Sequence, residues 1–203
     1  MTPKPTVFVV DDDPAVIDAV TGLVDLIDLD ARSYLSADDF LKEYEPTGPA
    51  CLVLDVRMPG MSGLDLQRAL AETGSTLPII MITGHGEVRM AVEAMKAGAA
   101  EFLEKPFRMQ ELCEAIQAAI RRDSEKWRRL EQRAGADRRF EDLTPAEREV
   151  MDLVIAGKTN KMIAEELGLS VRAIEDRRAR LMKKLEVKNR AELMALAAAL
   201  EPA

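Results

Sequence analysis

The chain has 203 residues, of which 47% are hydrophobic and 32% charged, and its formal net charge is −8. Residues 1–120 hold 9 Lys and Arg against 20 Asp and Glu, whereas residues 121–203 hold 19 against 16, which favours an acidic domain joined to a mildly basic one. The sequence shows no basic leader and no apolar stretch of membrane-spanning length, so we expect neither secretion nor membrane insertion.

Strands and helices are predicted to alternate along the first 120 residues. Apolar runs without polar alternation, such as residues 51–55, are typical of parallel strands covered by helices on both faces. Five such units predict an α/β fold with a flavodoxin-like, doubly wound, five-stranded parallel sheet. The expected elements are strand 7–10, helix 14–27, strand 31–34, a helix capped by Ser36, strand 51–55, helix 64–73, strand 79–83, helix 87–97, strand 101–104 and a helix from Met109.

Reactive side chains follow four of these strands. Acidic residues 11–13 follow the first strand, and Asp55 ends the third. Thr83 ends the fourth, and Lys105 follows the fifth, where Pro106 favours an extended backbone. The carboxyl ends of parallel strands meet at one edge of a sheet, so these groups should converge in a crevice. Adjacent carboxylates repel each other, and a hard divalent cation, Mg²⁺ or Mn²⁺, is expected to neutralise them.

This set of side chains predicts phosphoryl transfer to the protein itself. Asp55 would attack a phosphodonor, Lys105 would neutralise one phosphoryl oxygen, and Thr83 would donate a hydrogen bond to another. A cation held by Asp12 and Asp55 would spread the charge. We therefore expect a phosphoacceptor without substrate turnover rather than an enzyme. The plainer alternative for Asp55 alone is a carboxylate that only caps its strand.

The α/β half resembles the receiver domain of bacterial two-component response regulators. The matching pattern is an acidic pair after the first strand, an aspartate after the third, a hydroxyl residue after the fourth and Lys-Pro after the fifth. The resemblance implies that Asp55 is the phosphorylation site, that Asp12 binds the metal directly and that Asp11 does so mainly through water. It also implies a metal contact from the backbone carbonyl of Arg57 and a switch role for Phe102.

Residues 121–142 form a charged connector with 8 basic and 6 acidic residues. In one interpretation the preceding helix continues into it, and Trp127 and Leu130 extend an apolar seam that pairs weakly with a partner. Asp123 interrupts that seam, and fewer than three heptads are available. The favoured prediction is therefore a solvated helix that frays into a linker.

The remaining residues, 143–203, are predicted to form an all-α domain of four helices. A capping box over residues 144–147 opens the first helix. Helices 159–167 and 171–185 are separated by a tight glycine turn, which is typical of a helix-turn-helix unit. A final helix begins after Asn189 and runs to about residue 200.

The second helix of this pair has an apolar face and a charged face. Val171, Ile174, Leu181 and Leu185 share the apolar face. Residues 158–188 hold 9 basic and 5 acidic side chains, which is expected of a recognition helix flanked by phosphate contacts, although a solvated face is the plainer explanation. The candidate DNA contacts are Lys161, Arg172, Glu175, Asp176, Arg177, Ala179, Arg180, Lys183 and Lys184.

This half resembles the LuxR/NarL-type DNA-binding domain, and a receiver followed by it resembles the FixJ branch of response regulators. The residues that carry the resemblance are 143–150, 157–164 and 171–185. Arg177 stands where many relatives have histidine. Glu175 and Asp176 place acidic side chains next to the basic side chains of the same helix. The operator sequence is therefore left open.

The resemblance implies a cytoplasmic regulator that dimerises when phosphorylated and binds promoter DNA to regulate transcription. The two cysteines, interpreted as core thiols, fit a reducing compartment. The expected partners are a sensor histidine kinase, double-stranded DNA, a second copy of the chain and RNA polymerase, with no membrane partner. The dimer contacts are expected at residues 87–108, where opposite charges can pair across a two-fold axis, and at residues 190–200.

Three other classes fit parts of the sequence. Residues 11–13 superficially match the Asp-x-Asp of haloacid-dehalogenase phosphatases, but Pro14 and Ala15 follow where that family has a hydroxyl residue. An adaptor or phosphate sink could have a helical half that does not bind DNA. An RNA-binding output has little support, because only Phe140 is available for base stacking in that half. The one histidine, His85, is interpreted as a loop residue near the site.

Overall fold

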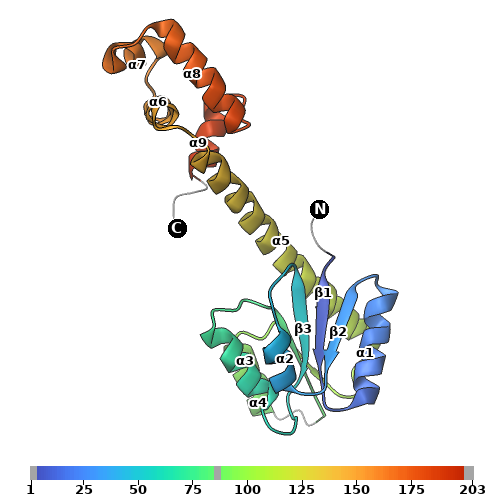
Figure 1. Ribbon diagram of the computed structural model, residues 1–203. Coiled ribbons are helices and arrows are strands. Elements are labelled where there is room, and N and C mark those ends of the chain that lie inside the picture. The colour runs from blue at the N-terminus through green and yellow to red at the C-terminus, as the bar shows by residue number, and fades with distance from the viewer. Residues whose placement is uncertain (1–3, 85–87, 199–203) are drawn as a thin grey trace. The chain divides into compact units, whose positions relative to one another are not determined.

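The computed structural model describes residues 4–84 and 88–198. Their contacts divide the chain into two compact units, one ending at Trp127 and the other beginning at Arg128. The first unit is an α/β domain and the second is helical (Figure 1). The domain boundaries at residues 120 and 142 stay predictions.

The α/β unit is built on a parallel sheet, which has five strands within the described residues, in the order β2-β1-β3-β4-β5. Every residue of β3 and β4 is buried, which is why their sequences lack polar alternation. The order is flavodoxin-like, so the fold prediction is confirmed. The strands are β1 (Thr6–Val10), β2 (Asp30–Tyr34), β3 (Ala50–Asp55), β4 (Ile79–Thr83) and β5 (Glu101–Glu104).

Helices cover both faces of the sheet (Figure 1). Leu52 and Leu54 of β3 face one apolar core, whereas Val53 between them faces the other, as the period of a strand requires. The first core is completed by α2 (Ala37–Glu43), α3 (Gly63–Glu72) and α4 (Val88–Lys96). The second is completed by α1 (Pro14–Leu26) and the amino-terminal part of α5 (Met109–Glu141).

Side-chain caps determine where the first three helices begin. Asp13, Ser36 and Ser62 each accept a hydrogen bond from a backbone N–H in the first turn of α1, α2 and α3. Such caps satisfy donors that the helix itself leaves unpaired. The cap at Ser62 starts α3 at Gly63, one residue earlier than the sequence predicted.

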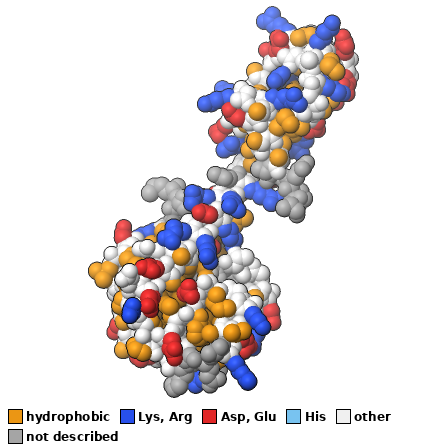
Figure 2. Space-filling model, turned by 180° about the vertical axis from the view of Figure 1, so that it is seen from behind, with side chains coloured by type: hydrophobic (Ala, Val, Ile, Leu, Met, Phe, Trp, Pro, Cys, Tyr) orange, Lys and Arg blue, Asp and Glu red, His pale blue; other side chains and the backbone are white. Residues whose placement is uncertain are grey.

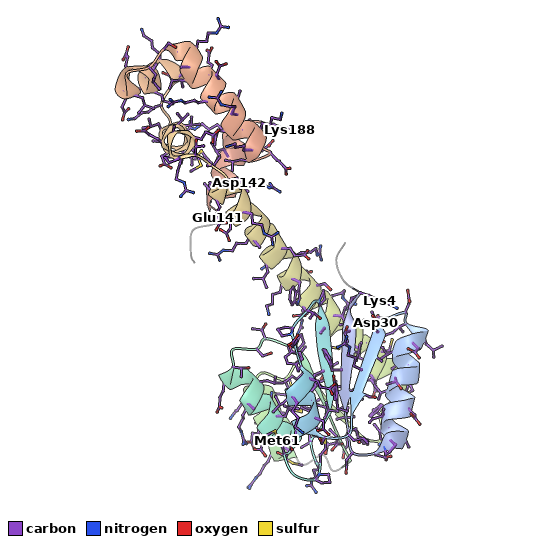
Figure 3. All side chains as sticks on the ribbon, viewed as in Figure 1. Lys4, Asp30, Met61, Glu141, Asp142 and Lys188 are labelled. Carbon is purple, nitrogen blue, oxygen red and sulfur yellow. The ribbon has the colours of Figure 1, made fainter. Side chains whose placement is uncertain are left out.

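Helix α5 is continuous to Glu141, and Asp142 follows outside it (Figure 3). The prediction that this helix frays within residues 121–142 is therefore wrong. Asp123, expected to interrupt the seam, is only 4% exposed, and its Oδ2 accepts the N–H of Ala50 at 2.8 Å. Burial raises the pKa of Asp123, although the Ala50 N–H opposes this effect. This hydrogen bond thus links the first residue of β3 to helix α5.

The helical unit packs around one apolar cluster that includes Val150, Ile163, Ile174 and Leu193. Gly168, at φ 65°, ends the second of its helices in a left-handed conformation, as the glycine turn predicted. Val171, predicted to face inward, is 41% exposed because it is the first residue of its helix. The helices after α5 are α6 (Pro145–Ile155), α7 (Asn160–Leu167), α8 (Val171–Lys184) and α9 (Arg190–Ala198). Among the residues described, no helix is long and apolar enough to cross a membrane.

Candidate phosphorylation site and DNA-binding surface

The predicted reactive side chains lie at the carboxyl edge of the sheet. Asp11 follows β1, Asp55 ends β3, Thr83 ends β4, and Lys105 follows β5. The strand ends are level, because β1 and β3 pair in register and Thr83 pairs with Glu104. Asp11, Asp55 and Thr83 are 0%, 4% and 0% exposed. Two carboxylates and a hydroxyl residue are thus buried together at the carboxyl edge of the sheet.

Lys105 joins the two buried carboxylates. Its Nζ donates to Asp11 Oδ2 and to Asp55 Oδ1, each at 2.7 Å. The second oxygen of each carboxylate accepts a backbone N–H, from Asp13 at 2.9 Å and from Arg57 at 2.6 Å. Both acids are therefore held in fixed orientations, and one ammonium is shared between two carboxylates.

Burial and charge pairing act against each other at this site. Burial raises the pKa of Asp11, and the hydrogen bond from Lys105 only partly opposes that effect. Burial alone would lower the pKa of Lys105, but its hydrogen bonds to Asp11 and Asp55 outweigh it, so the pKa is raised. Lys105 is therefore a cation at neutral pH, and the site has an excess of acid.

Gly63 is a site residue whose role the sequence reasoning missed. It is the first residue of α3, and its N–H donates to the carbonyl of Val56 at 3.0 Å. A Cβ at this position would collide with the backbone carbonyl of Asp55. Only glycine lets α3 begin so close to the end of β3. The available signal was the Ser62 and Asp65 capping pair on either side of it.

Thr83 and Phe102, which the sequence predicts to act as a switch pair, lie on the paired strands β4 and β5. Thr83 is buried at the end of β4, and its backbone carbonyl accepts the N–H of Lys105 at 2.7 Å. Phe102 on β5 is half-buried and packs against the core that α4 also contacts.

The oxygen donors at this edge suit a hard cation. Asp11 and Asp55 are within hydrogen-bond distance of one Nζ, and Asp12 is exposed beside them. Over residues 4–84 and 88–198, no three acidic, histidine or cysteine side chains form a ready-made ligand set. Mg²⁺ suits such a place, since it needs only one or two carboxylates with waters. His85, expected near the site, lies outside the described residues.

The candidate DNA surface lies on α8 and the start of α7, and Figure 2 shows basic side chains projecting from the helical unit. Arg177 is half-buried, as is the adjacent Arg178. The exposed candidates are Lys161, Arg172, Glu175, Asp176, Ala179, Arg180, Lys183 and Lys184.

Two basic residues of α8 are engaged within the domain. Lys184 Nζ donates to Glu147 Oε2 at 2.7 Å and to the carbonyl of Asp142 at 3.1 Å. Arg178, which the sequence reasoning passed over, donates to Asn160 Oδ1 at 2.9 Å and ties α8 to α7. These contacts tie α8 to α6 and α7.

The predicted dimer surface on α4 is already partly paired within the chain. Glu93 accepts a hydrogen bond from Arg68 Nη2 of α3 at 2.7 Å. Val92 and Met95 on the same helix are 45% and 46% exposed, so the surface is apolar as well as charged. Residue 87 of the first predicted contact and residues 199–200 of the second lie outside the described residues.

Two family models match the chain. The response regulator receiver domain matches residues 7–117, and the luxR family of bacterial regulatory proteins matches residues 141–197. The chain is also similar, over nearly its whole length, to two solved structures. The response regulator StyR has 41% identity and a TM-score of 0.87, with 97% of this chain and 99% of that one covered. Full-length FixJ from B. japonicum has 38% identity and a TM-score of 0.58, with 98% of each chain covered.

Characterised relatives are similar over most of their length. Nodulation protein W of Bradyrhizobium diazoefficiens is 45% identical over 193 residues, which cover 94% of this chain and 84% of the relative. Transcriptional regulatory protein FixJ of Azorhizobium caulinodans is 41% identical over 199 residues, which cover 97% and 94%. With its receiver and luxR-family domains in this order, the chain belongs to the two-component response regulators of the FixJ type, which regulate transcription.

Proposed function

We propose that Asp55 accepts a phosphoryl group from the phosphohistidine of a sensor kinase. An oxygen of Asp55 bonds to phosphorus while the bond from phosphorus to the donor nitrogen breaks, which leaves an acyl phosphate on the protein. The observation that carries the proposal is the bridge of Lys105 to Asp11 and Asp55, each at 2.7 Å. An ammonium already placed between these acids can turn to a phosphoryl oxygen without a large movement.

The same edge is proposed to hold Mg²⁺ or Mn²⁺. Asp12, Asp55 and the backbone carbonyl of Arg57 would bind the ion directly, and Asp11 mainly through water. When bound, the ion would neutralise charge on the transferring phosphoryl group. Support comes from the all-oxygen character of the donors and from the excess of acid over Lys105.

Phosphorylation is proposed to act through Thr83 and Phe102. A phosphoryl oxygen on Asp55 attracts the Thr83 hydroxyl, and the space that Thr83 leaves is filled by the ring of Phe102. Because Phe102 packs against the core shared with α4, this rotation changes the surface made by α4 and β5.

That surface is the proposed dimer contact. Residues 87–108 would meet their own copy across a two-fold axis, and residues 190–200 would form a second contact between DNA-bound output domains. The dimer then presents two α8 helices to double-stranded DNA. Lys183 and Arg172 would contact phosphates, and Asp176 would lie near base edges. RNA polymerase is the further partner that a promoter-bound regulator would meet.

The test is phosphoryl labelling by a small phosphodonor. Asp55→Asn keeps the side-chain volume and loses the nucleophilic charge, so labelling should fall to background while the fold is retained. Asp18→Asn, an exposed aspartate on α1, is the matched control and should label normally. Chelation of divalent cations should suppress labelling, and Asp12→Ala should raise the cation concentration required. Equal labelling of Asp55→Asn and wild type would contradict the site, and labelling unaffected by chelation would contradict the metal.

A further inference from the structure

Glu175 is an acidic side chain among basic ones on the exposed face of α8. Arg172 precedes it by three residues, and Ala179 and Lys183 follow it by four and eight, so helical spacing places them on one face with it. All four residues are exposed. Glu175 also borders a hollow of about 450 Å³, whose lining includes Lys188. The carboxylate therefore lies on a surface whose other charged groups are mostly cations.

The guanidinium of Arg178 is near Glu175 in the sequence but is used elsewhere. Residues three apart on a helix can form an ion pair, and Arg178 follows Glu175 by three. Its Nη1 instead donates to Asn160 Oδ1 of α7 at 2.9 Å. Within the described residues, the side chain of Glu175 forms neither an ion pair nor a hydrogen bond. Its two oxygens are therefore available to a donor from outside the chain.

A carboxylate close to DNA needs such a donor, because the phosphates repel it. An ionised carboxylate only accepts hydrogen bonds, and the donors in the major groove are the amino groups of cytosine and adenine. Adenine places its N7 acceptor beside the amino group, whereas guanine and thymine present acceptors there. Cytosine is therefore the base that a carboxylate on α8 would favour. Arg172 and Lys183 on the same face reduce the repulsion when they contact phosphates.

We propose that Glu175 recognises a cytosine in the major groove by accepting a hydrogen bond from its amino group. The hydrogen bond from Arg178 to Asn160 is a positioning contact, which keeps the guanidinium away from Glu175. The inference rests on the proposed DNA binding and deepens it, since it names a base and the residue that recognises it. Arg178, although basic, then has a role other than attraction of phosphates.

Selection of bound fragments from a pool of random double-stranded DNA tests the base contact. The full chain is used with a small phosphodonor, and the enriched fragments are sequenced. The wild type should enrich a cytosine whose replacement weakens binding about fivefold or more. Glu175→Gln should change that preference to adenine, because a glutamine amide both donates to and accepts from adenine. Glu165→Gln, the same change at an exposed position of α7, should keep the cytosine.

The outcomes separate this inference from the proposed function. If the wild type and Glu165→Gln enrich one sequence and Glu175→Gln enriches the same one, DNA binding stands and the role of Glu175 is refuted. If the wild type enriches no sequence, the proposed sequence-specific binding fails and the inference fails with it.

The positioning contact has a test of its own. Asn160→Ala removes the acceptor, so Arg178 can turn to Glu175, and the preference for cytosine should fall. Adding Arg178→Ala to Asn160→Ala should restore the preference, because no guanidinium is then left at that position. Arg178→Ala alone should leave the salt dependence of binding unchanged, whereas loss of a phosphate contact reduces it by about one unit. An unchanged preference in Asn160→Ala, or a reduced salt dependence in Arg178→Ala, would refute the positioning role.

Discussion

Glu147 is predicted to hold α8 in place through an ion pair with Lys184. Its Oε2 accepts from Lys184 Nζ at 2.7 Å and from the N–H and hydroxyl of Thr144, each at 2.9 Å. These contacts lower the pKa of Glu147 from 4.5 to about 2, with Lys184 as the largest cause. The carboxylate closes the capping box of α6 and at the same time ties it to the last turn of α8.

The stabilisation follows from that lowered pKa. A fall from 4.5 to about 2 corresponds to at most about 3 kcal/mol at neutral pH. The Glu147 side chain is 6% exposed but that of Lys184 is 37% exposed, so solvent screening reduces the value to about 1–2 kcal/mol. Glu147→Gln, which removes the charge and keeps the shape, should lower the melting temperature of the helical unit by about 5–15 °C.

The dependence on pH gives a second, independent check. Because the pKa is lower in the folded state, the stabilisation is fully present above about pH 4.5 and is lost as the pH falls towards about 2. The difference in unfolding free energy between wild type and Glu147→Gln should therefore shrink over that range. Thermal and denaturant unfolding of the full chain measures it, with the exposed Glu149→Gln as control. Equal stability of Glu147→Gln and wild type at pH 7 would refute the reasoning.

Three further outcomes are expected. Lys183→Ala and Arg172→Ala should weaken binding to any duplex and reduce the salt dependence by about one unit per phosphate contact, whereas Asp176→Ala should change sequence preference; equal losses on specific and random DNA for Asp176→Ala would argue against a base contact. Gly63→Ala should lower the unfolding free energy by about 2 kcal/mol or more and reduce Asp55 labelling, whereas the control Gly22→Ala, with open space at its Cβ, should be neutral or stabilising. Wild-type stability and labelling of Gly63→Ala would contradict the close approach of α3 to the Asp55 backbone. Lys96→Glu and Arg89→Glu should each weaken the phosphorylation-dependent dimer several-fold in sedimentation experiments, and a dimer that ignores both reversals would place the contact elsewhere.

The carboxyl edge of the sheet could be predicted because topology alone determines it. Once buried runs identify parallel strands, their last residues must share one edge, whatever the side chains between them do. In the sequence Lys105 lies 94 positions from Asp11 and 50 positions from Asp55. Their contact nevertheless follows from the strand order. The sequence could not give the role of Gly63, because it depends on how closely α3 approaches the backbone of Asp55.

Contacts of individual polar side chains were harder to predict. Lys183 and Lys184 are adjacent and identical in type, but Lys184 reaches Glu147, 37 positions away. Asp123 looked like a break in an apolar seam, yet it accepts the N–H of Ala50, 73 positions away. A helical pattern gives the face on which a residue lies, whereas its partner depends on packing between distant segments. Charge counts alone therefore overestimate the number of residues free to bind DNA.

Pairing within the chain also lowers the affinity expected from the charges of the proposed dimer surface. Glu93 is already paired with Arg68, so a partner copy would have to replace that pair, and exposed ion pairs contribute only about 0–1 kcal/mol each. Val92 and Met95, nearly half exposed on α4, would each contribute about 1 kcal/mol when covered. The apolar side chains should therefore supply most of the affinity. The charges of residues 87–108 would then set the register and exclude wrong partners, which is why their reversal is the sharper probe of geometry.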